Sequence, residues 1–236
     1  MELTAEAFTA RLEELASAEE LAKIQRYFKT GDGEYGAGDV FLGVRMGSVF
    51  ALAKEYAAMP PEEIGKLLDS PVHEVRAGAL SVMDKQARAA KTTVERRAEL
   101  YELYLRRMDR IDNWDLVDLG APYVVGGWLA DKPRDVLYAM ARSENLWERR
   151  TAMLATLCFA RQNDLDDVYG IAEVLLSDEH DLIRKAVGGM LREAGKRDRP
   201  TLLTFLDAHA ARMPRTMLRY AIEHLDDAQR AHYRSL

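Results

Sequence analysis

Cysteine, proline and long apolar stretches are scarce in this chain of 236 residues. Its one cysteine, Cys158, lies in an apolar run and has no partner for a disulfide within the chain, which excludes a small disulfide-rich fold and indicates a buried thiol or a reducing compartment. No stretch approaches the roughly 18 apolar residues of a membrane span, and the acidic N-terminus lacks the pattern of a secretory signal. We therefore expect a cytoplasmic protein that does not enter a membrane.

The balance of hydrophobic and charged residues is that of a protein with a large folded core. Hydrophobic residues make up 48% of the chain and charged residues 31%, a balance that excludes intrinsic disorder and collagen-like sequence. The simplest organisation is a single domain over 1–236. Within it we expect N-terminal helices and a glycine-rich loop in 1–45, and helical repeats in 46–236.

Patterns typical of strands are nearly absent. Apolar spacing, together with helix start and stop signals, predicts an all-α protein. The predicted helices span 4–16, 19–29, 46–58, 61–68, 71–89, 94–109, 113–130, 133–142, 144–161, 167–177, 180–196, 199–211 and 214–224. Several prolines fall at the starts of these helices, where the missing N–H is not needed. They are Pro61, Pro71, Pro133, Pro200 and Pro214.

A weak internal repeat runs through the predicted helices. The segments that begin at Ser70, Ser143 and Ser177 share a serine N-cap, acids in the first helical turn and a basic residue about two turns later. Equivalent positions recur about every 32 to 41 residues, which is the length of a HEAT-type helix pair. These positions are Ala77, Asp118, Arg150 and Lys185. The repeat predicts an α-solenoid of HEAT-like two-helix units, whose second helices line a concave binding surface.

The sequence contains no convincing metal or cofactor motif. The G-x-G-x-x-G sequence from Gly31 to Gly36 follows a predicted helix and contains acids, so we interpret it as a connection between helices rather than a dinucleotide site. Walker A and G-x-S-x-G sequences are absent, and the histidines are scattered without the spacing of zinc ligands. We expect neither a metal nor a cofactor.

Charge is distributed unevenly along the chain. The formal net charge of −6 argues, taken alone, against a nucleic-acid partner. Residues 184–219, however, contain nine Lys or Arg against three acids, whereas residues 1–20 contain six acids against Arg11. The C-terminal third is therefore a candidate phosphate-binding face.

One polar constellation falls at the expected concave positions. Trp114 and Asp118 are four residues apart on one predicted helix and so share a face, while Arg150 and Lys185 occupy the matching positions of the next repeats. One interpretation is structural, with a core tryptophan, Asp118 paired with Arg150 and solvated basic residues. The other is chemical, because a carboxylate near an aromatic ring and a guanidinium suits the oxocarbenium-like transition state of glycosidic cleavage.

These residues lie in segments that resemble the AlkD family of DNA glycosylases, the HEAT-like DNA alkylation repair proteins. Single segments are weak matches, but several occur in the family's order over nearly the whole chain. The segments are Arg26–Lys29, Phe41–Arg45, His73-Glu74-x-Arg76, Asn113–Asp118, Leu146–Ala152, Lys185–Glu193 and Met213–Ala221.

The resemblance implies a C-shaped solenoid that binds duplex DNA in a concave basic groove. It further implies a monomeric, monofunctional enzyme that hydrolyses the N-glycosidic bond of cationic N3- or N7-alkylated purines in base excision repair. Asp118 would stabilise the sugar cation and orient water, Trp114 would pack against the deoxyribose, and Arg150 would hold a phosphate. The other DNA-binding positions would be Tyr27, Arg45, Trp147, Arg149, Lys185, Arg192, Lys196, Arg215 and Arg219.

One departure from the family pattern affects the expected activity. Active members carry a tryptophan directly after the first glycine of the Lys-Ala-x-Gly segment, where this chain has Gly189. Losing that ring would lower the rate or redirect it to another lesion, unless Trp147 or Trp128 supplies the contact. Two alternatives therefore stay open: a non-catalytic module that binds damaged, bent or branched DNA, and a HEAT scaffold that binds an acidic peptide.

Overall fold

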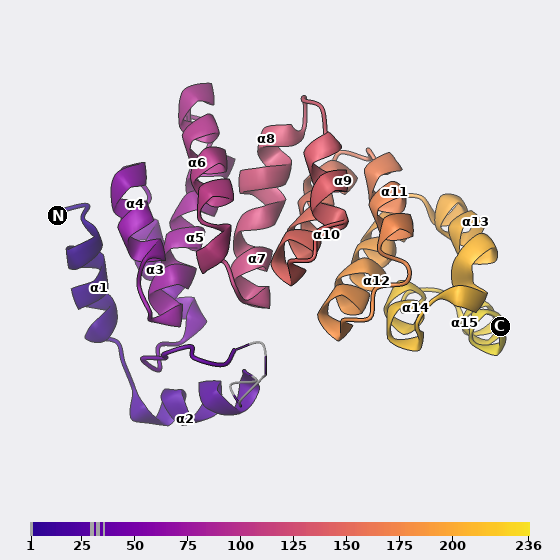
Figure 1. Cartoon of the computed structure of the whole chain (residues 1–236), viewed down its shortest axis with the longest axis horizontal. Helices are drawn as coiled ribbons and strands as arrows, with labels where there is room; N and C mark the ends of the chain where they lie inside the picture. Colours follow the sequence, from indigo (N-terminus) through magenta and orange to yellow (C-terminus); the bar gives the residue numbers. More distant parts are fainter. Residues whose placement is uncertain (1, 29–30, 32–33, 35) are drawn as a thin grey trace. The chain divides into compact units, whose positions relative to one another are not determined.

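A computed structural model of the chain describes residues 2–28, 31, 34 and 36–236 (Figure 1). Its regular structure, over those residues, is helical, with no strand and one isolated parallel bridge between Val40 and Val72, which confirms the all-α prediction. Contacts group the chain into two compact units, Met1–Val124 and Val125–Leu236, called the first and second unit here. The single domain stays a prediction, and part of the predicted glycine-rich loop lies outside the described residues.

The helices follow the predicted order. Those of the first unit are α1 (Ala5–Glu13), α2 (Ala18–Tyr27), α3 (Met46–Glu55), α4 (Pro61–Leu68), α5 (His73–Arg88), α6 (Val94–Arg106) and α7 (Trp114–Gly120). Those of the second unit are α8 (Gly127–Leu129), α9 (Asp135–Ala141), α10 (Leu146–Ala160), α11 (Asp166–Val174), α12 (Asp181–Gly195), α13 (Arg199–His209), α14 (Arg215–Ala221) and α15 (Asp227–Ser235). Short 3₁₀ turns follow α6 and α13, at Met108–Arg110 and Ala210–Arg212.

Two differences from the predicted helices have physical causes. The single helix predicted over 113–130 is α7, a π-helical turn at Ala121–Gly126, and α8. Pro122 lies in that turn and has no N–H to donate to the carbonyl of Asp118, so the regular α-helical bond is lost there. The last helix, α15, was not predicted at all.

The predicted serine caps are wrong in detail, although the local repeat is real. The N-caps of α5, α10 and α12 are Val72, Asn145 and His180. In each case a short side chain two residues earlier accepts the backbone N–H of the cap residue, at 2.8 to 3.1 Å. Serine and aspartate form such turns because their oxygen reaches the backbone two residues on. The accepting residues are Ser70, Ser143 and Asp178.

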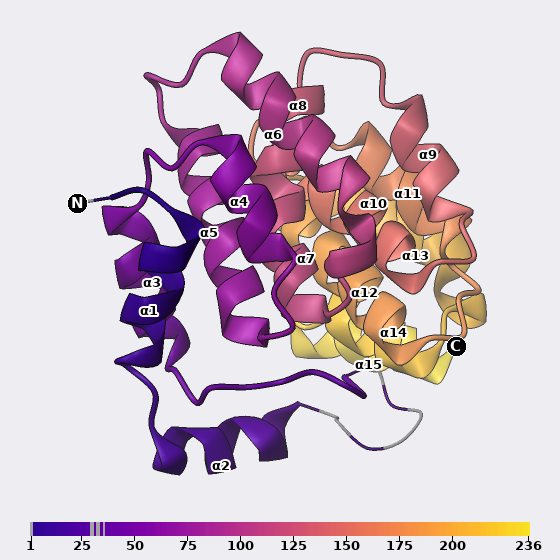
Figure 2. The ribbon, with the colours of Figure 1, turned by 60° about the vertical axis from the view of Figure 1, so that its left-hand side comes forward.

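Each unit is organised around its longest helices. In the first unit, α5 contacts α3, α4, α6 and α7, and every residue from His73 to Met83 is buried. In the second, α10 contacts α9, α11 and α12, and α12 contacts α13 and α14. Helix α2 lies apart from the other helices of its unit, and a non-helical stretch at 36–45 leads to α3 (Figure 2).

Two sequence-based expectations concern burial. Cys158 is 6% exposed in α10, and burial raises the pKa of its thiol, so it is a core residue as expected. In the described part of the chain, no helix combines the length and the apolar character that crossing a bilayer requires.

Adjacent glycines in α12 give a direct test of this packing. A Cβ on Gly188 would lie 2.4 Å from the Met217 carbonyl oxygen and 2.6 Å from the Tyr220 Cβ, whereas a Cβ on Gly189 meets nothing within 4 Å. We expect Gly188→Ala to lower the melting temperature because α14 must move away. Gly189→Ala should stabilise the protein by about 0.5 to 1 kcal/mol, as alanine does within helices. Equal effects of the two substitutions in thermal unfolding would contradict the close contact of α12 with α14.

Candidate functional site

The N-terminus of α7 carries the two residues singled out by the sequence. Trp114 is the first residue of the helix and Asp118 lies one turn later, so both project from the same face, and both are partly exposed. Asn113 caps the helix by accepting the Trp114 N–H at 2.8 Å, and its amide donates to Asp39 Oδ2 at 2.8 Å. Asp115 accepts the N–H of Leu116 at 2.9 Å. Side-chain hydrogen bonds thus fix where the helix begins.

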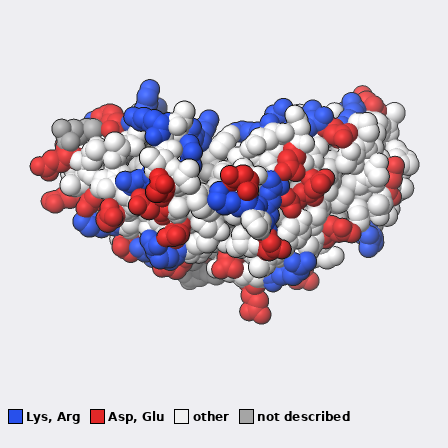
Figure 3. Space-filling model, turned by 90° about the horizontal axis from the view of Figure 1, so that it is seen from above, with Lys and Arg blue, Asp and Glu red and all other residues white. Residues whose placement is uncertain are grey.

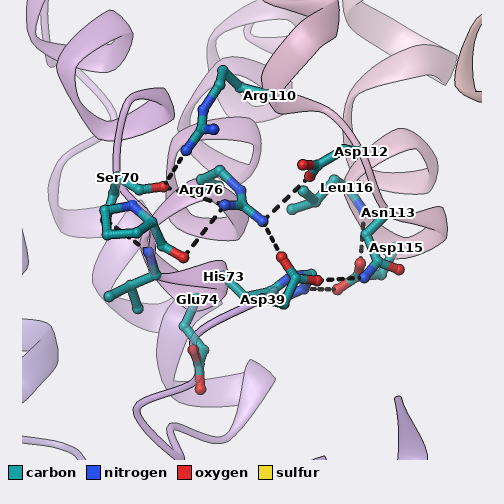
Figure 4. A network of polar contacts seen from close by, with 12 residues as sticks. Asp39, Ser70, His73, Glu74, Arg76, Arg110, Asp112, Asn113, Asp115 and Leu116 are labelled. Atoms are coloured by element: carbon teal, nitrogen blue, oxygen red, sulfur yellow. Dashed lines mark hydrogen bonds and ion pairs between the residues drawn. The ribbon is translucent and has the colours of Figure 1, made fainter. Parts of the chain in front are cut away.

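A buried histidine lies directly behind this helix start (Figure 4). The Nε2 of His73 is 2.7 Å from Asp115 Oδ2, and its Nδ1 is 3.4 Å from Asp39 Oδ2. Burial alone would lower the pKa of the imidazole, but the two carboxylates raise it to about 9. His73 is therefore an imidazolium at neutral pH, and it joins the N-terminus of α5 to that of α7 and to the segment that holds Asp39.

Arg76 extends this cluster on the other side of Asp39. Its Nη2 lies 2.5 Å from Asp39 Oδ1 and 3.2 Å from Asp112 Oδ1. Burial raises the pKa of Asp112, whereas bonds to His73, Asn113 and Arg76 outweigh burial at Asp39 and lower its pKa. This cluster, called the His73 network here, consists of the side chains of His73, Arg76, Asp39, Asp112 and Asp115. It places charges of opposite sign in contact, and buried charges need such partners because the protein interior has a low dielectric constant.

Glu74 attaches the non-helical stretch to the same end of α5. Its carboxylate accepts the backbone N–H groups of Leu42, Gly43 and Val44 at 2.9 to 3.2 Å. Gly43 has a φ of +84°, and a Cβ there would lie 2.4 Å from the Ser17 carbonyl oxygen, so this position requires glycine. The contact holds residues 42–44 against both α5 and the start of α2.

An aromatic pocket of about 460 Å³ opens beside Trp114. Phe28 stacks on Trp114 with ring centroids 5.8 Å apart, and Tyr27, which is 68% exposed, meets Trp114 edge to face at 5.9 Å. Phe41 and Arg45 also line the pocket. The structure thus brings together three predicted site residues, Trp114, Tyr27 and Arg45. Exposed aromatic faces beside a guanidinium can pack against a sugar or base.

The two predicted arginines on α10 bond to the start of α12 and to the segments that precede α12 and α10. Arg150 is 6% exposed, and its Nη1 donates to the Leu182 carbonyl at 2.7 Å. Arg149 binds Asp178 at 2.7 Å and two backbone carbonyls at 2.9 Å. Trp147 is partly exposed in the first turn of α10. Arg150 belongs to the second unit, whereas Trp114 and Asp118 belong to the first.

Most of the remaining predicted basic residues have carboxylate partners. Lys185 pairs with Asp181 at 2.7 Å, and Lys196 pairs with Glu193 at 2.7 Å. Arg192 pairs with Glu223, and Arg45 pairs with Glu20 at 2.7 Å. Arg215 and Arg219 are exposed on α14. The face shown in Figure 3 likewise has basic and acidic side chains next to one another rather than one continuous charge.

Sequence reasoning missed the His73 network. His73 and Arg76 entered only as members of a segment that resembles the family, and Asp39 and Asp115 were not singled out. The available signal was a histidine followed by Glu74 and Arg76 at the start of a helix whose next two turns are mostly apolar. Over the described residues, no group of three or more His, Cys, Asp or Glu side chains is arranged to hold a metal ion.

The raised pKa of His73 makes a stability prediction with a definite sign. Because the folded-state pKa is about 9 and the ordinary value is 6.5, the histidine stabilises the fold fully below pH 6.5 and loses this contribution as pH rises through 9. The free energy of unfolding should fall over that window in the wild type and show a much smaller fall in His73→Gln. His224→Gln, at an exposed histidine, is the matched control. Parallel pH profiles for the wild type and His73→Gln would contradict the buried ion pair.

Comparison with known proteins finds one family and one solved structure that are similar to this chain. A family model described as DNA alkylation repair enzyme matches residues 8–225. A solved structure described as a predicted DNA alkylation repair enzyme from Enterococcus faecalis is 18% identical, with a TM-score of 0.69 over 90% of this chain and 97% of that one, which shows a shared fold. No curated protein sequence matches the chain. Because the family model spans most of its length, the chain belongs to the DNA alkylation repair enzyme family.

Proposed function

We propose that this protein is a monofunctional DNA glycosylase that removes cationic N3- or N7-alkylated purines from duplex DNA. The observation that carries the proposal is the placement of Trp114 and Asp118 one turn apart on α7, in a chain of the DNA alkylation repair enzyme family. The four-residue spacing that suggested Trp114 and Asp118 in the sequence thus lies within a single helix, which Asn113 caps. The enzyme would act as a monomer in the cytoplasm and would need neither metal nor cofactor.

Cleavage of the glycosidic bond of an alkylated purine needs little general acid catalysis. An alkylated purine is already positively charged, so when the bond between its nitrogen and the sugar C1′ breaks, the base takes the electron pair and leaves neutral. The sugar develops oxocarbenium character, which the Asp118 carboxylate would stabilise. Asp118 would also orient a water molecule toward C1′ and accept its proton, so that an abasic site forms. The Trp114 ring would pack against the deoxyribose, and Arg150 would hold a neighbouring phosphate.

The surroundings of α7 support this assignment because they restrict its position. Asn113 and the His73 network fix the first turn, and the π-helical turn at Ala121–Gly126 follows directly after α7. Catalytic groups need positions held to a fraction of an ångström, which capped helix ends anchored to a core can give. π-Helical turns are also common at functional sites.

DNA binding would use the side chains that already line the pocket and the C-terminal helices. We propose a HEAT-like α-solenoid with a concave, C-shaped groove, in which Tyr27 and Arg45 contact one part of the duplex. Trp147, Arg149, Lys185, Arg192, Lys196, Arg215 and Arg219 would contact other parts. The repeated turns before α5, α10 and α12 support this architecture.

The proposal is tested first at the carboxylate. Asp118→Asn should lower release of 7-methylguanine from methylated duplex at least about 100-fold, because the amide cannot stabilise the developing cation. Asp131→Asn, at an exposed carboxylate, is the matched control and should release base at the wild-type rate. Thermal unfolding checks that both variants are folded. Wild-type release by Asp118→Asn would refute the assigned role.

A second test concerns the missing family tryptophan. Because a Cβ on Gly189 meets nothing within 4 Å, Gly189→Trp can be introduced without a clash at the backbone. A ring that contacts the sugar should raise the rate of base release about tenfold to a hundredfold. Gly189→Ala controls for the gain in helix stability. A folded Gly189→Trp variant with an unchanged rate would show that this position no longer faces the substrate.

Gly189 also favours the second candidate function. A chain that lacks one aromatic contact could have kept the DNA-binding surface and lost the chemistry. It would then be a non-catalytic module that binds damaged, bent or branched DNA through the same residues. Salt-sensitive duplex binding is expected of both candidates, whereas base release is expected only of the enzyme.

A further inference from the structure

Helix α15 lies beyond the part of the chain that the family model matches, which ends at residue 225. It is nevertheless firmly attached to the second unit. Tyr233 is 3% exposed, and its hydroxyl donates to Asp207 Oδ1 at 2.7 Å. Arg215, at the start of α14, donates to the Arg234 carbonyl at 3.3 Å. The last helix is therefore placed by both α13 and α14.

A pocket of about 640 Å³ is formed where α15 meets α12 and α14. Its charged lining consists of four arginines and two acids. These residues are Arg192, Arg219, Arg230, Arg234, Glu223 and Asp227. Two of the arginines come from α15 and were not among the residues that the sequence suggested.

Both acids are already engaged by arginines. Glu223 pairs with Arg192, and Asp227 pairs with Arg230. Arg230 also donates to the Leu225 carbonyl at 2.6 Å, so it bonds to the segment that connects α14 to α15. Its guanidinium therefore has a structural role in holding the chain between α14 and α15.

Two guanidiniums remain in the pocket without a carboxylate. Arg219 lies 5.6 Å from the centroid of the Tyr220 ring, and neither Arg219 nor Arg234 pairs with an acid among the residues that the structure describes. Arg215 precedes Arg219 by one turn of α14 and contacts the backbone of Arg234. Two cations that line one pocket repel each other to a degree set by their separation, and an anion bound between them would relieve that repulsion.

We propose that Arg219 and Arg234 form a binding site for a backbone phosphate of duplex DNA. Guanidinium groups bind phosphate oxygens through paired hydrogen bonds. Arg219 and Arg234 come from different helices, α14 and α15, so their side chains can hold one phosphate between them. The inference rests on the proposed function only in taking duplex DNA as the source of the phosphate. It assigns the helix outside the family match a direct part in holding DNA.

The test is equilibrium binding of an unmodified duplex, measured by fluorescence anisotropy over a series of salt concentrations. Arg234→Gln should weaken binding and reduce the slope of log K against log salt by about 0.9, the value of one phosphate contact. Arg219→Gln should do the same. Arg142→Gln, at the exposed arginine that directly follows α9, is the matched control and should keep the wild-type slope. Slopes for Arg234→Gln and Arg219→Gln equal to that of the control would overturn the proposal.

Two further measurements distinguish free phosphate from DNA phosphate, and phosphate binding from base release. If inorganic phosphate raises the melting temperature of the wild type but not of Arg234→Gln, while duplex affinity is unchanged, the site binds free phosphate and the DNA assignment is wrong. If the wild type releases no base from methylated duplex but Arg234→Gln still lowers the salt slope, the phosphate site stands and the glycosylase proposal fails.

Discussion

The buried imidazolium of His73 is the contact on which the arrangement of the first unit depends. It lies between Asp115 at the start of α7 and Asp39 in the non-helical stretch, while Arg76 holds Asp39 from the other side. Buried charges are costly unless they are paired and well oriented, so the carboxylates and cations constrain one another's positions. Removing one of them leaves a buried charge without a partner. The cluster therefore restricts how α5, α7 and residues 39–45 can sit together, and with them the helix that carries Trp114 and Asp118.

The sequence predicted what local patterns determine. The α4 helix at Pro61–Leu68 was predicted to the residue because a proline marks its start and the apolar spacing is regular. By contrast, α15 has Tyr233 as its only buried residue, so periodicity could not reveal it. Trp114 and Asp118 could be recognised because their spacing lies within one helix. The bonds from His73 to Asp39 and Asp115 could not, because no local pattern encodes contacts between residues 34 and 42 positions apart.

The pairing of basic side chains bears on how a protein with a net charge of −6 would bind DNA as proposed. Several of the basic residues proposed to contact DNA are matched by a neighbouring acid, as Lys185 is by Asp181 and Lys196 by Glu193. Exposed ion pairs of this kind contribute little to stability, so a phosphate can replace the carboxylate at small cost. Arg219 and Arg234 differ because the acids around them are bound by other arginines. Binding would then begin at unpaired cations and extend to paired ones.

We propose that this protein, although it lacks one aromatic contact of its family, still breaks the glycosidic bond rather than only binding the duplex. Single-turnover release of 7-methylguanine, at protein concentrations that saturate the methylated duplex, tests it directly. We expect first-order release well above the spontaneous rate, with abasic sites formed and the strand left intact. Saturated, salt-sensitive binding accompanied by release at the spontaneous rate would contradict it.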